Sequence, residues 1–308
     1  MCTAPFLVPE ATTTEYIFDL LQHRSPGRHT AVAYCKLATL IDNEAKASRG
    51  RGGGHSVSQR AVVLADDPQA AEPIYWYRKA VEVAPNYAKA HLNLGITLDE
   101  TGGGGGGAAK RAFLASAKLG NPQAAYKIGT EYYPKGDRKH VQWITQAAAL
   151  GHTDGIYVLG MVYEHGWGVG VDHALSVLLY RRAALQASND ALFALGNHYK
   201  RGTLGLDVDL NASFALVSLA AAKGFRDAQF NAGNAMLQGI NGAPKKDVAA
   251  AQRYFQSATL QDHKKAKCML GYCIAIRGGP GAARGRSILR QCSQDGDQVA
   301  THMLQNLY

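Results

Sequence analysis

Six segments of the chain repeat one arrangement of small and apolar residues at intervals of 31 to 38 residues. Each segment is centred on a glycine, and these are Gly95, Gly129, Gly160, Gly196, Gly233 and Gly271. The residue five positions earlier is always alanine or glycine, and the residue just before the glycine is leucine, isoleucine or alanine. Three positions after the glycine comes leucine, tyrosine, methionine or isoleucine. Positions four apart share one face of an α-helix, so the pattern predicts a helix with a small-residue face that packs closely on a partner.

A second helix is predicted in each repeat. Another glycine follows the central one after six or seven residues, which favours a left-handed end to the first helix. Asp172, Asp209 and Asp247 then stand where each can accept a hydrogen bond from the start of a second helix. Apolar pairs such as Leu179 and Tyr180 recur inside these second helices. Each repeat is therefore expected to be two antiparallel helices that share one small-residue seam.

The copy that runs from Gly155 to Ala184 carries nearly every recurring position, including Leu159-Gly160, Tyr163, Gly166 and Asp172. It resembles the Sel1-like repeat family, which is related to the tetratricopeptide repeats. The resemblance implies an all-α fold, a right-handed α-solenoid of about six to seven antiparallel hairpins over residues 69–308. Residues 1–68 are expected to form a partly irregular N-terminal helical cap, with helices near 13–22, 29–48 and 57–66. The segments 57–66 and 70–84 could together form a seventh hairpin.

A row of larger side chains stands three residues before the central glycines. In helical repeats of this kind that position tends toward the concave side, so the row and nearby polar residues predict a groove for a partner peptide or helix. The candidate residues are Tyr126, Tyr157, Glu164, His165, Phe193, Asn197, Lys200, Arg201 and Phe230. The alternative for the aromatic residues is plain stacking between successive first helices.

The net charge of +9 is concentrated at one end of the chain. Residues 263–308 hold seven basic and two acidic side chains, a balance of +5. The candidate basic end consists of Lys264, Lys265, Lys267, Arg284, Arg286 and Arg290. It suits an acidic protein surface or an RNA backbone, and the alternative is a solvated terminal face.

Nothing in the sequence supports catalysis. The histidines lie in different repeats without ligand spacing, and no nucleophile elbow or carboxylate pair stands out. The glycine run 102–107 lacks the Lys-Ser/Thr ending of a phosphate-binding loop and is expected to be a flexible loop. We expect no cofactor and no metal, and a scaffold or adaptor within a multisubunit protein complex. An RNA-binding subunit and a regulatory subunit that activates an enzyme are the alternatives.

The five cysteines are odd in number and avoid the middle repeats. They favour a reducing compartment, with Cys268, Cys273 and Cys292 as separate, small buried side chains. The first 24 residues have neither the basic start nor the long apolar core of a signal peptide, and no apolar run is long enough to span a membrane. The expected location is intracellular, in the cytoplasm, with the mitochondrion as the alternative.

Overall fold

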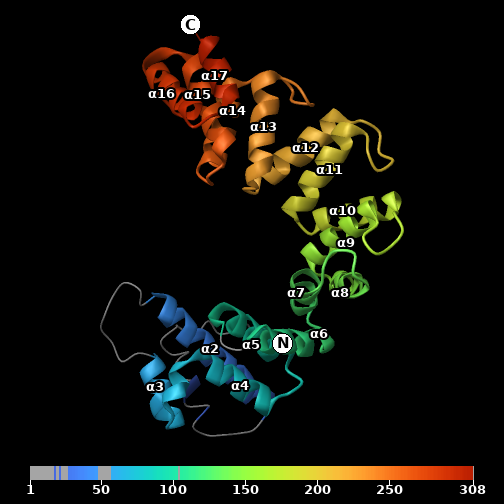
Figure 1. Ribbon diagram of the computed structural model, residues 1–308, viewed down its shortest axis with the longest axis vertical. Coiled ribbons are helices and arrows are strands. Elements are labelled where there is room, and N and C mark those ends of the chain that lie inside the picture. Colours follow the sequence, from blue (N-terminus) through green and yellow to red (C-terminus); the bar gives the residue numbers. More distant parts are fainter. Residues whose placement is uncertain (1–16, 19–20, 22–26, 48–56, 103–104, 308) are drawn as a thin grey trace, which may run out of the picture. The chain divides into compact units, whose positions relative to one another are not determined.

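The computed structural model describes residues 17–18, 21, 27–47, 57–102 and 105–307. Within these ranges every regular element is an α-helix or a short 3-10 helix (Figure 1). The chain forms two compact units, Met1–His152 and Thr153–Tyr308. The predicted division after residue 68 stays a prediction.

The first unit holds the N-terminal helices and two of the predicted hairpins. Its elements are α2 (Arg28–Ala47), α3 (Val57–Ala65), η1 (Pro68–Ala71), α4 (Pro73–Val83), α5 (Ala88–Thr101), α6 (Gly105–Lys118), α7 (Pro122–Tyr132) and α8 (Arg138–Ala149). Helix α5 pairs with α6, and α7 pairs with α8, as predicted. Helices α2 and α3 agree with the predictions for 29–48 and 57–66, whereas most of 13–22 lies outside the described residues.

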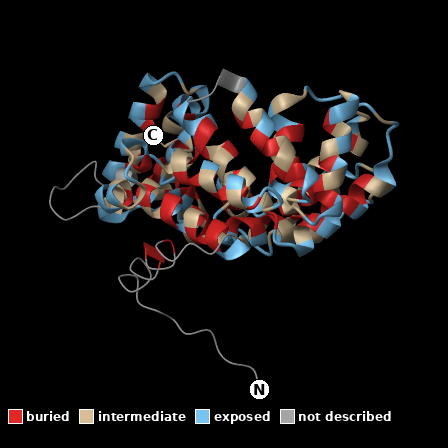
Figure 2. Ribbon diagram, turned by 90° about the horizontal axis from the view of Figure 1, so that it is seen from below, coloured by how far each residue is buried: buried red, intermediate tan, exposed pale blue. Residues whose placement is uncertain are grey.

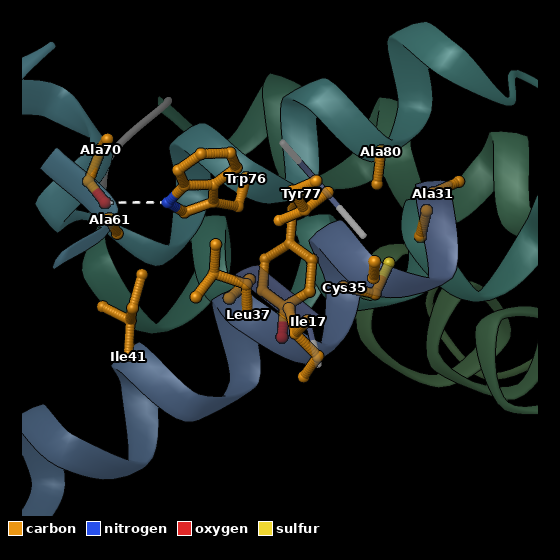
Figure 3. Close-up of a cluster of buried hydrophobic side chains, with 14 of the residues drawn as sticks. Ile17, Ala31, Cys35, Leu37, Ile41, Ala61, Ala70, Trp76, Tyr77 and Ala80 are labelled. Carbon is orange, nitrogen blue, oxygen red and sulfur yellow. Dashed lines mark hydrogen bonds between the residues drawn. The ribbon is translucent and has the colours of Figure 1, made fainter. Parts of the chain in front are cut away.

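The partner of α4 differs from the prediction. Helix α4 packs along α2 rather than on α3, and Figure 3 shows Leu37 and Ile41 of α2 beside Trp76 and Tyr77 of α4. The indole N–H of Trp76 donates a 2.8 Å hydrogen bond to the carbonyl of Ala70 in η1. The reason is packing area, because the twenty-residue α2 offers a longer apolar stripe than the nine-residue α3.

The second unit continues the hairpins. Its elements are α9 (Thr153–His165), α10 (His173–Leu185), α11 (Asn189–Arg201), α12 (Leu210–Ala222), α13 (Arg226–Gln238), α14 (Val248–Thr259), α15 (Lys264–Arg277), η2 (Gly279–Gly281), α16 (Ala282–Gln294) and α17 (Gln298–Gln305). They pair in order, α9 with α10 through α15 with α16, and α17 packs on α16. Figure 2 shows buried residues on the sides of helices that face other helices and exposed residues in the loops.

The small-residue seam is confirmed. The alanines five positions before the central glycines are fully buried, and the glycines lie directly against the second helix of the same hairpin. A Cβ atom on Gly160 would lie 2.7 Å from the ring of Tyr180, and one on Gly233 would lie 2.7 Å from the ring of Phe255. No real Cβ contact is this short, so the approach of the two helices depends on glycine.

The helix ends also follow the sequence. The side chains of Asp172, Asp209 and Asp247 accept hydrogen bonds of 2.8–2.9 Å from backbone N–H groups three residues later, as predicted. Of the predicted glycine ends, Gly102, Gly202 and Gly239 are left-handed C-caps. Helix α16 has no side-chain cap at its start, which agrees with the degenerate last copy.

Two further predictions were wrong. The glycine run is not wholly a loop, because residues 105–107 form the first turn of α6. Each helical glycine costs up to about 1 kcal/mol, but Phe113 of α6 is fully buried against α5, and this packing outweighs the cost. Cys268 and Cys292 are not separate side chains but form a disulfide between α15 and α16, which brings residues distant in sequence together. Cys273 does lie buried with a free thiol.

Among the described helices, none is both long and apolar enough to cross a membrane.

Candidate functional site

Three aspartates occupy equivalent places in the second unit. Asp154, Asp190 and Asp227 are each the second residue of a first helix, in α9, α11 and α13. Partial burial raises the pKa of the Asp190 carboxyl, and the charges of Asp154 and Asp227 raise it further. The three carboxylates are therefore close enough to create one negative region across successive repeats. Such a region attracts cationic side chains.

Asp227 is also the member of this row with partners inside the protein. Its carboxylate lies 3.3 Å from Nε of Arg226 and 3.8 Å from Nε2 of His263. Both the Asp227 and Arg226 side chains remain about half exposed. Ion pairs of this kind at a surface are weak, so they leave Asp227 able to exchange partners.

The aromatic residues of the predicted groove are half-buried and packed on other rings. In the second unit the pairs are Tyr157 with Tyr180 at 5.5 Å, Phe193 with Phe225 at 5.3 Å and Phe230 with His263 at 4.5 Å between ring centroids. In the first unit, Tyr126 stacks on His152 at 4.5 Å. Part of every ring thus supports the contact between elements, as the stacking alternative describes, and part stays accessible.

The polar residues of the prediction lie mainly on α11. Asn197 is half-buried, whereas Lys200 and Arg201 are exposed in the last turn. With Asp190 and Phe193 they recur at intervals of three and four residues and so share one face of α11. This face carries an acid at its first turn and bases at its last turn, the order that the helix dipole favours.

Glu164 and His198 belong to a polar cluster that connects three helices. The Tyr180 hydroxyl donates a 2.5 Å hydrogen bond to the carboxylate of Glu164, and Nε2 of His198 lies 3.6 Å from the same carboxylate. Nδ1 of His198 is 2.8 Å from the hydroxyl oxygen of Thr203. His165 stacks on Trp167 at the edge of this cluster, with its Nδ1 3.0 Å from the carbonyl oxygen of Met161. The cluster fixes α9, α10 and α11 together.

The surroundings of the cluster shift the pKa of two of its groups. Burial raises the pKa of the Tyr180 hydroxyl, and its hydrogen bond to the Glu164 carboxylate adds to the shift, so the phenol stays protonated. Burial lowers the pKa of His198, although the carboxylate of Glu164 acts in the opposite direction. The Thr203 hydroxyl contacts Nδ1 of His198, and Nε2 of the same ring faces the Glu164 carboxylate, so these polar groups are partners of one another. In the described ranges, no three His, Cys, Asp or Glu residues come together as ligands of a metal ion.

The lowered pKa of His198 predicts a pH-dependent stability. Because the folded state binds the proton more weakly than the unfolded state, the stabilisation is complete above about pH 6.5 and is lost as pH falls through the lower folded pKa. We expect the free energy of unfolding, measured with urea, to decrease more steeply between pH 7.5 and pH 5.5 in the native protein than in a His198→Gln variant. Equal slopes for the two proteins would contradict the assignment.

The residues of the predicted basic end are distributed over both helices of the last hairpin, α15 and α16. Its residues are exposed except for Arg286, which is half-buried. Because α15 and α16 are antiparallel and the disulfide joins their facing ends, the lysines at the start of α15 lie near the end of α16 that carries Arg290. Arg284 lies toward the other end of α16. Arg286 and Arg290 are four residues apart on α16, so they share one face of that helix, on which Arg290 is the more exposed of the two.

Sequence reasoning missed the aspartate row and the roles of Tyr180 and His198. The row had a visible signal, since each aspartate directly precedes the small residue of its repeat, Gly155, Ala191 or Ala228. The polar cluster had no such signal in the sequence, because three separate helices contribute its members.

Comparisons with known proteins bear on the repeat. The family model described as Sel1 repeat matches residues 115–152, 153–188, 189–225 and 226–263. An exopolysaccharide production negative regulator of Rhizobium leguminosarum bv. viciae is 28% identical over 189 residues, 56% of this chain and 68% of that protein. Chitin synthase regulatory factor 3 of Schizosaccharomyces pombe is 34% identical over 125 residues, 40% of this chain but only 13% of that protein. The crystal structure of a Sel1 repeat protein from Oxalobacter formigenes superposes with a TM-score of 0.59 at 21% identity and covers 100% of this chain and 97% of its own.

Proposed function

We propose that this chain, a Sel1 repeat protein over residues 115–263, is a non-catalytic regulatory adaptor that binds a partner protein through one face of α9, α11 and α13. The main observation in support of this proposal is that the three helices carry equivalent residues at equivalent positions. Each contributes an aspartate in its first turn and an accessible aromatic edge one turn later. A series of this kind can hold an extended segment that crosses successive repeats.

The chemistry of the face indicates the partner. The aspartate row favours lysine or arginine side chains, the ring edges favour apolar ones, and Lys200 with Arg201 favours a carboxylate at the other end of α11. The ring edges contribute binding area, and the charges set the orientation of the bound segment. A polynucleotide is disfavoured here, because its phosphates would meet three carboxylates.

The regulatory part of the proposal draws on the relatives. Two of them, one bacterial and one fungal, are named as regulators, of exopolysaccharide production and of chitin synthase. Since this chain spans only 13% of the fungal protein, the enzyme named there is no guide to the target here. We take from both names only a regulatory role.

The test is capture of partners from cells of the native host. Replacing Lys200 and Arg201 with alanine is expected to reduce partner recovery severalfold, because a desolvated charge pair is lost, while helicity and melting temperature stay unchanged. Recovery is measured by affinity purification with mass spectrometry after nuclease treatment. A matched control replaces the exposed Lys245 and Lys246, which removes the same charge from the α13–α14 loop. Equal recovery with the two double variants would place the interface elsewhere.

RNA binding at the basic end is a second candidate, favoured by the exposed Lys264, Lys265, Lys267 and Arg290. If these residues contact phosphates, the logarithm of the binding constant for a single-stranded RNA probe decreases linearly with the logarithm of the salt concentration. Replacing Lys265 and Arg290 with glutamate should then reduce both the affinity and the salt slope. A probe that does not bind at low salt, or an unchanged slope, would exclude this candidate.

A further inference from the structure

The outer side of α12 differs from that of the second helices before and after it. Helix α12 has no ionisable residue among its thirteen positions, yet Ala215, Leu219 and Ala222 are exposed, with 48% of Leu219 accessible. The outer side of α10 and the end of α14 also expose leucines, Leu178 and Leu260, but these helices carry exposed arginines as well, such as Arg182 and Arg253. A helix at a protein surface normally has a polar outer face, so this apolar strip calls for a partner.

The strip is complementary to itself in shape. Ala215, Leu219 and Lys223 are spaced by four residues and share one face of the helix. If two α12 helices cross antiparallel about a two-fold axis near Val217, Leu219 of each copy lies over Ala215 of the other. A large side chain then faces a small one twice. A two-fold interface requires this kind of self-complementary patch.

The charges at the ends of α12 follow the same symmetry. Asp207 and Asp209 precede the helix and Lys223 follows it, all three exposed. Antiparallel pairing brings Lys223 of one copy near the aspartates of the other, and does so twice. Like charges would meet instead if the two helices ran parallel. Shape and charge therefore favour the same arrangement.

We propose that two copies of this chain associate through antiparallel α12 helices around Ala215, Leu219 and Lys223. The helix is only about 20 Å long, so the interface falls below the size of a stable dimer, and the complex dissociates at micromolar concentrations. Lys223 also lines the surface hollow that contains Asp227, whereas Ala215 and Leu219 belong to α12 and not to the first helices proposed to bind the partner protein. Leu219→Glu therefore tests this contact separately from that function.

Sedimentation velocity of the full chain over a wide concentration range tests the apolar contact. We expect reversible dimers that are lost in Leu219→Glu and kept in Leu185→Glu, a matched change at a leucine that is 89% exposed on α10. Circular dichroism and melting curves identify any variant that fails to fold, in which case Ala215→Glu replaces it. A native chain that stays monomeric throughout, or equal dimerisation of the Leu219 and Leu185 variants, overturns the proposal. Monomers whose capture of a different protein depends on Leu219 overturn it in favour of that other occupant.

A charge exchange tests the orientation. Lys223→Glu and Asp207→Lys are each expected to weaken dimerisation at low salt when tested alone. Mixing the two variants should recover it, because each two-fold contact then pairs opposite charges again. Asp209 is left unchanged, since it caps α12. A mixture no stronger than the single variants would rule out the antiparallel pairing.

Discussion

Replacing Gly160 with leucine is expected to lower the free energy of unfolding by about 3 kcal/mol or more. The Cβ atom alone would lie 2.7 Å and 2.8 Å from two ring atoms of Tyr180. That ring cannot retreat easily, since it is 1% exposed and its hydroxyl is held by the Glu164 carboxylate. Gly196→Leu should behave alike, because its Cβ would lie 2.8 Å from the side chain of Val217.

Urea or thermal unfolding measures these losses. Gly170→Leu is the matched control, because a Cβ at Gly170 has no heavy atom within 4 Å and its backbone is outside the left-handed region. We expect a change within about 0.5 kcal/mol for the control. Small and equal shifts for all three variants would mean that the helices of each hairpin do not approach as closely as described. A control at Gly104 is less useful, because Gly104 lies outside the described residues.

The hairpins were predictable because their signals are local and repeated. Close packing of two helices needs small residues at fixed spacing, and aspartate caps act on backbone groups three residues away, so both leave a periodic trace in the sequence. Ala191 with Gly196, and Asp209 ahead of α12, show this within one hairpin. Because the same spacing recurs in six repeats, a single sequence was enough to predict the fold class.

What the sequence did not reveal depends on contacts between distant residues. The pairing of α4 with α2 depends on Trp76 packing in one core cluster with Leu37, and no repeated sequence pattern predicts this packing. The helical start of α6 depends on the burial of Phe113, which outweighs the preference of glycine for loops. In each case tertiary packing overrides the local preference of the chain.

The candidate binding face was predictable only in part. Residue type and spacing selected Asn197, Lys200 and Arg201 on one face of α11, and the last two of these are exposed. Periodicity could not reveal how much of each ring is used for packing, since an aromatic residue has the same spacing in a groove and in a core. Whether this face binds the partner stays a prediction until capture is measured.

The odd cysteine count suggested a reducing compartment, and the Cys268–Cys292 disulfide removes part of that argument. Counting residues cannot show that two of five thiols face each other across one hairpin. The remaining buried thiols are inert in the folded chain, because burial raises the pKa of both Cys35 and Cys273 to about 12. Among the cysteines that the structure describes, a redox response is therefore expected at the Cys268–Cys292 disulfide.

Reducing that disulfide is expected to lower the free energy of unfolding of the second unit by about 2–4 kcal/mol. The bond joins residues 24 positions apart and so restricts the unfolded chain, and it secures α16, whose start lacks a side-chain cap. Urea unfolding with and without a phosphine reductant measures the loss. A Cys268→Ala, Cys292→Ala double variant is the control, because the reductant should not change its unfolding midpoint.

Two results would contradict the disulfide's role. One is an intact mass, after thiol blocking without reductant, that shows every cysteine alkylated. The other is a native midpoint that the reductant does not move. The same mass measurement on protein taken from its native cells bears on location, because such bonds persist in oxidising compartments and are rare where thiols are kept reduced. A disulfide found in protein from native cells would argue against the expected cytoplasmic location. If the two cysteines are reduced there, we expect α16 to unfold before α15.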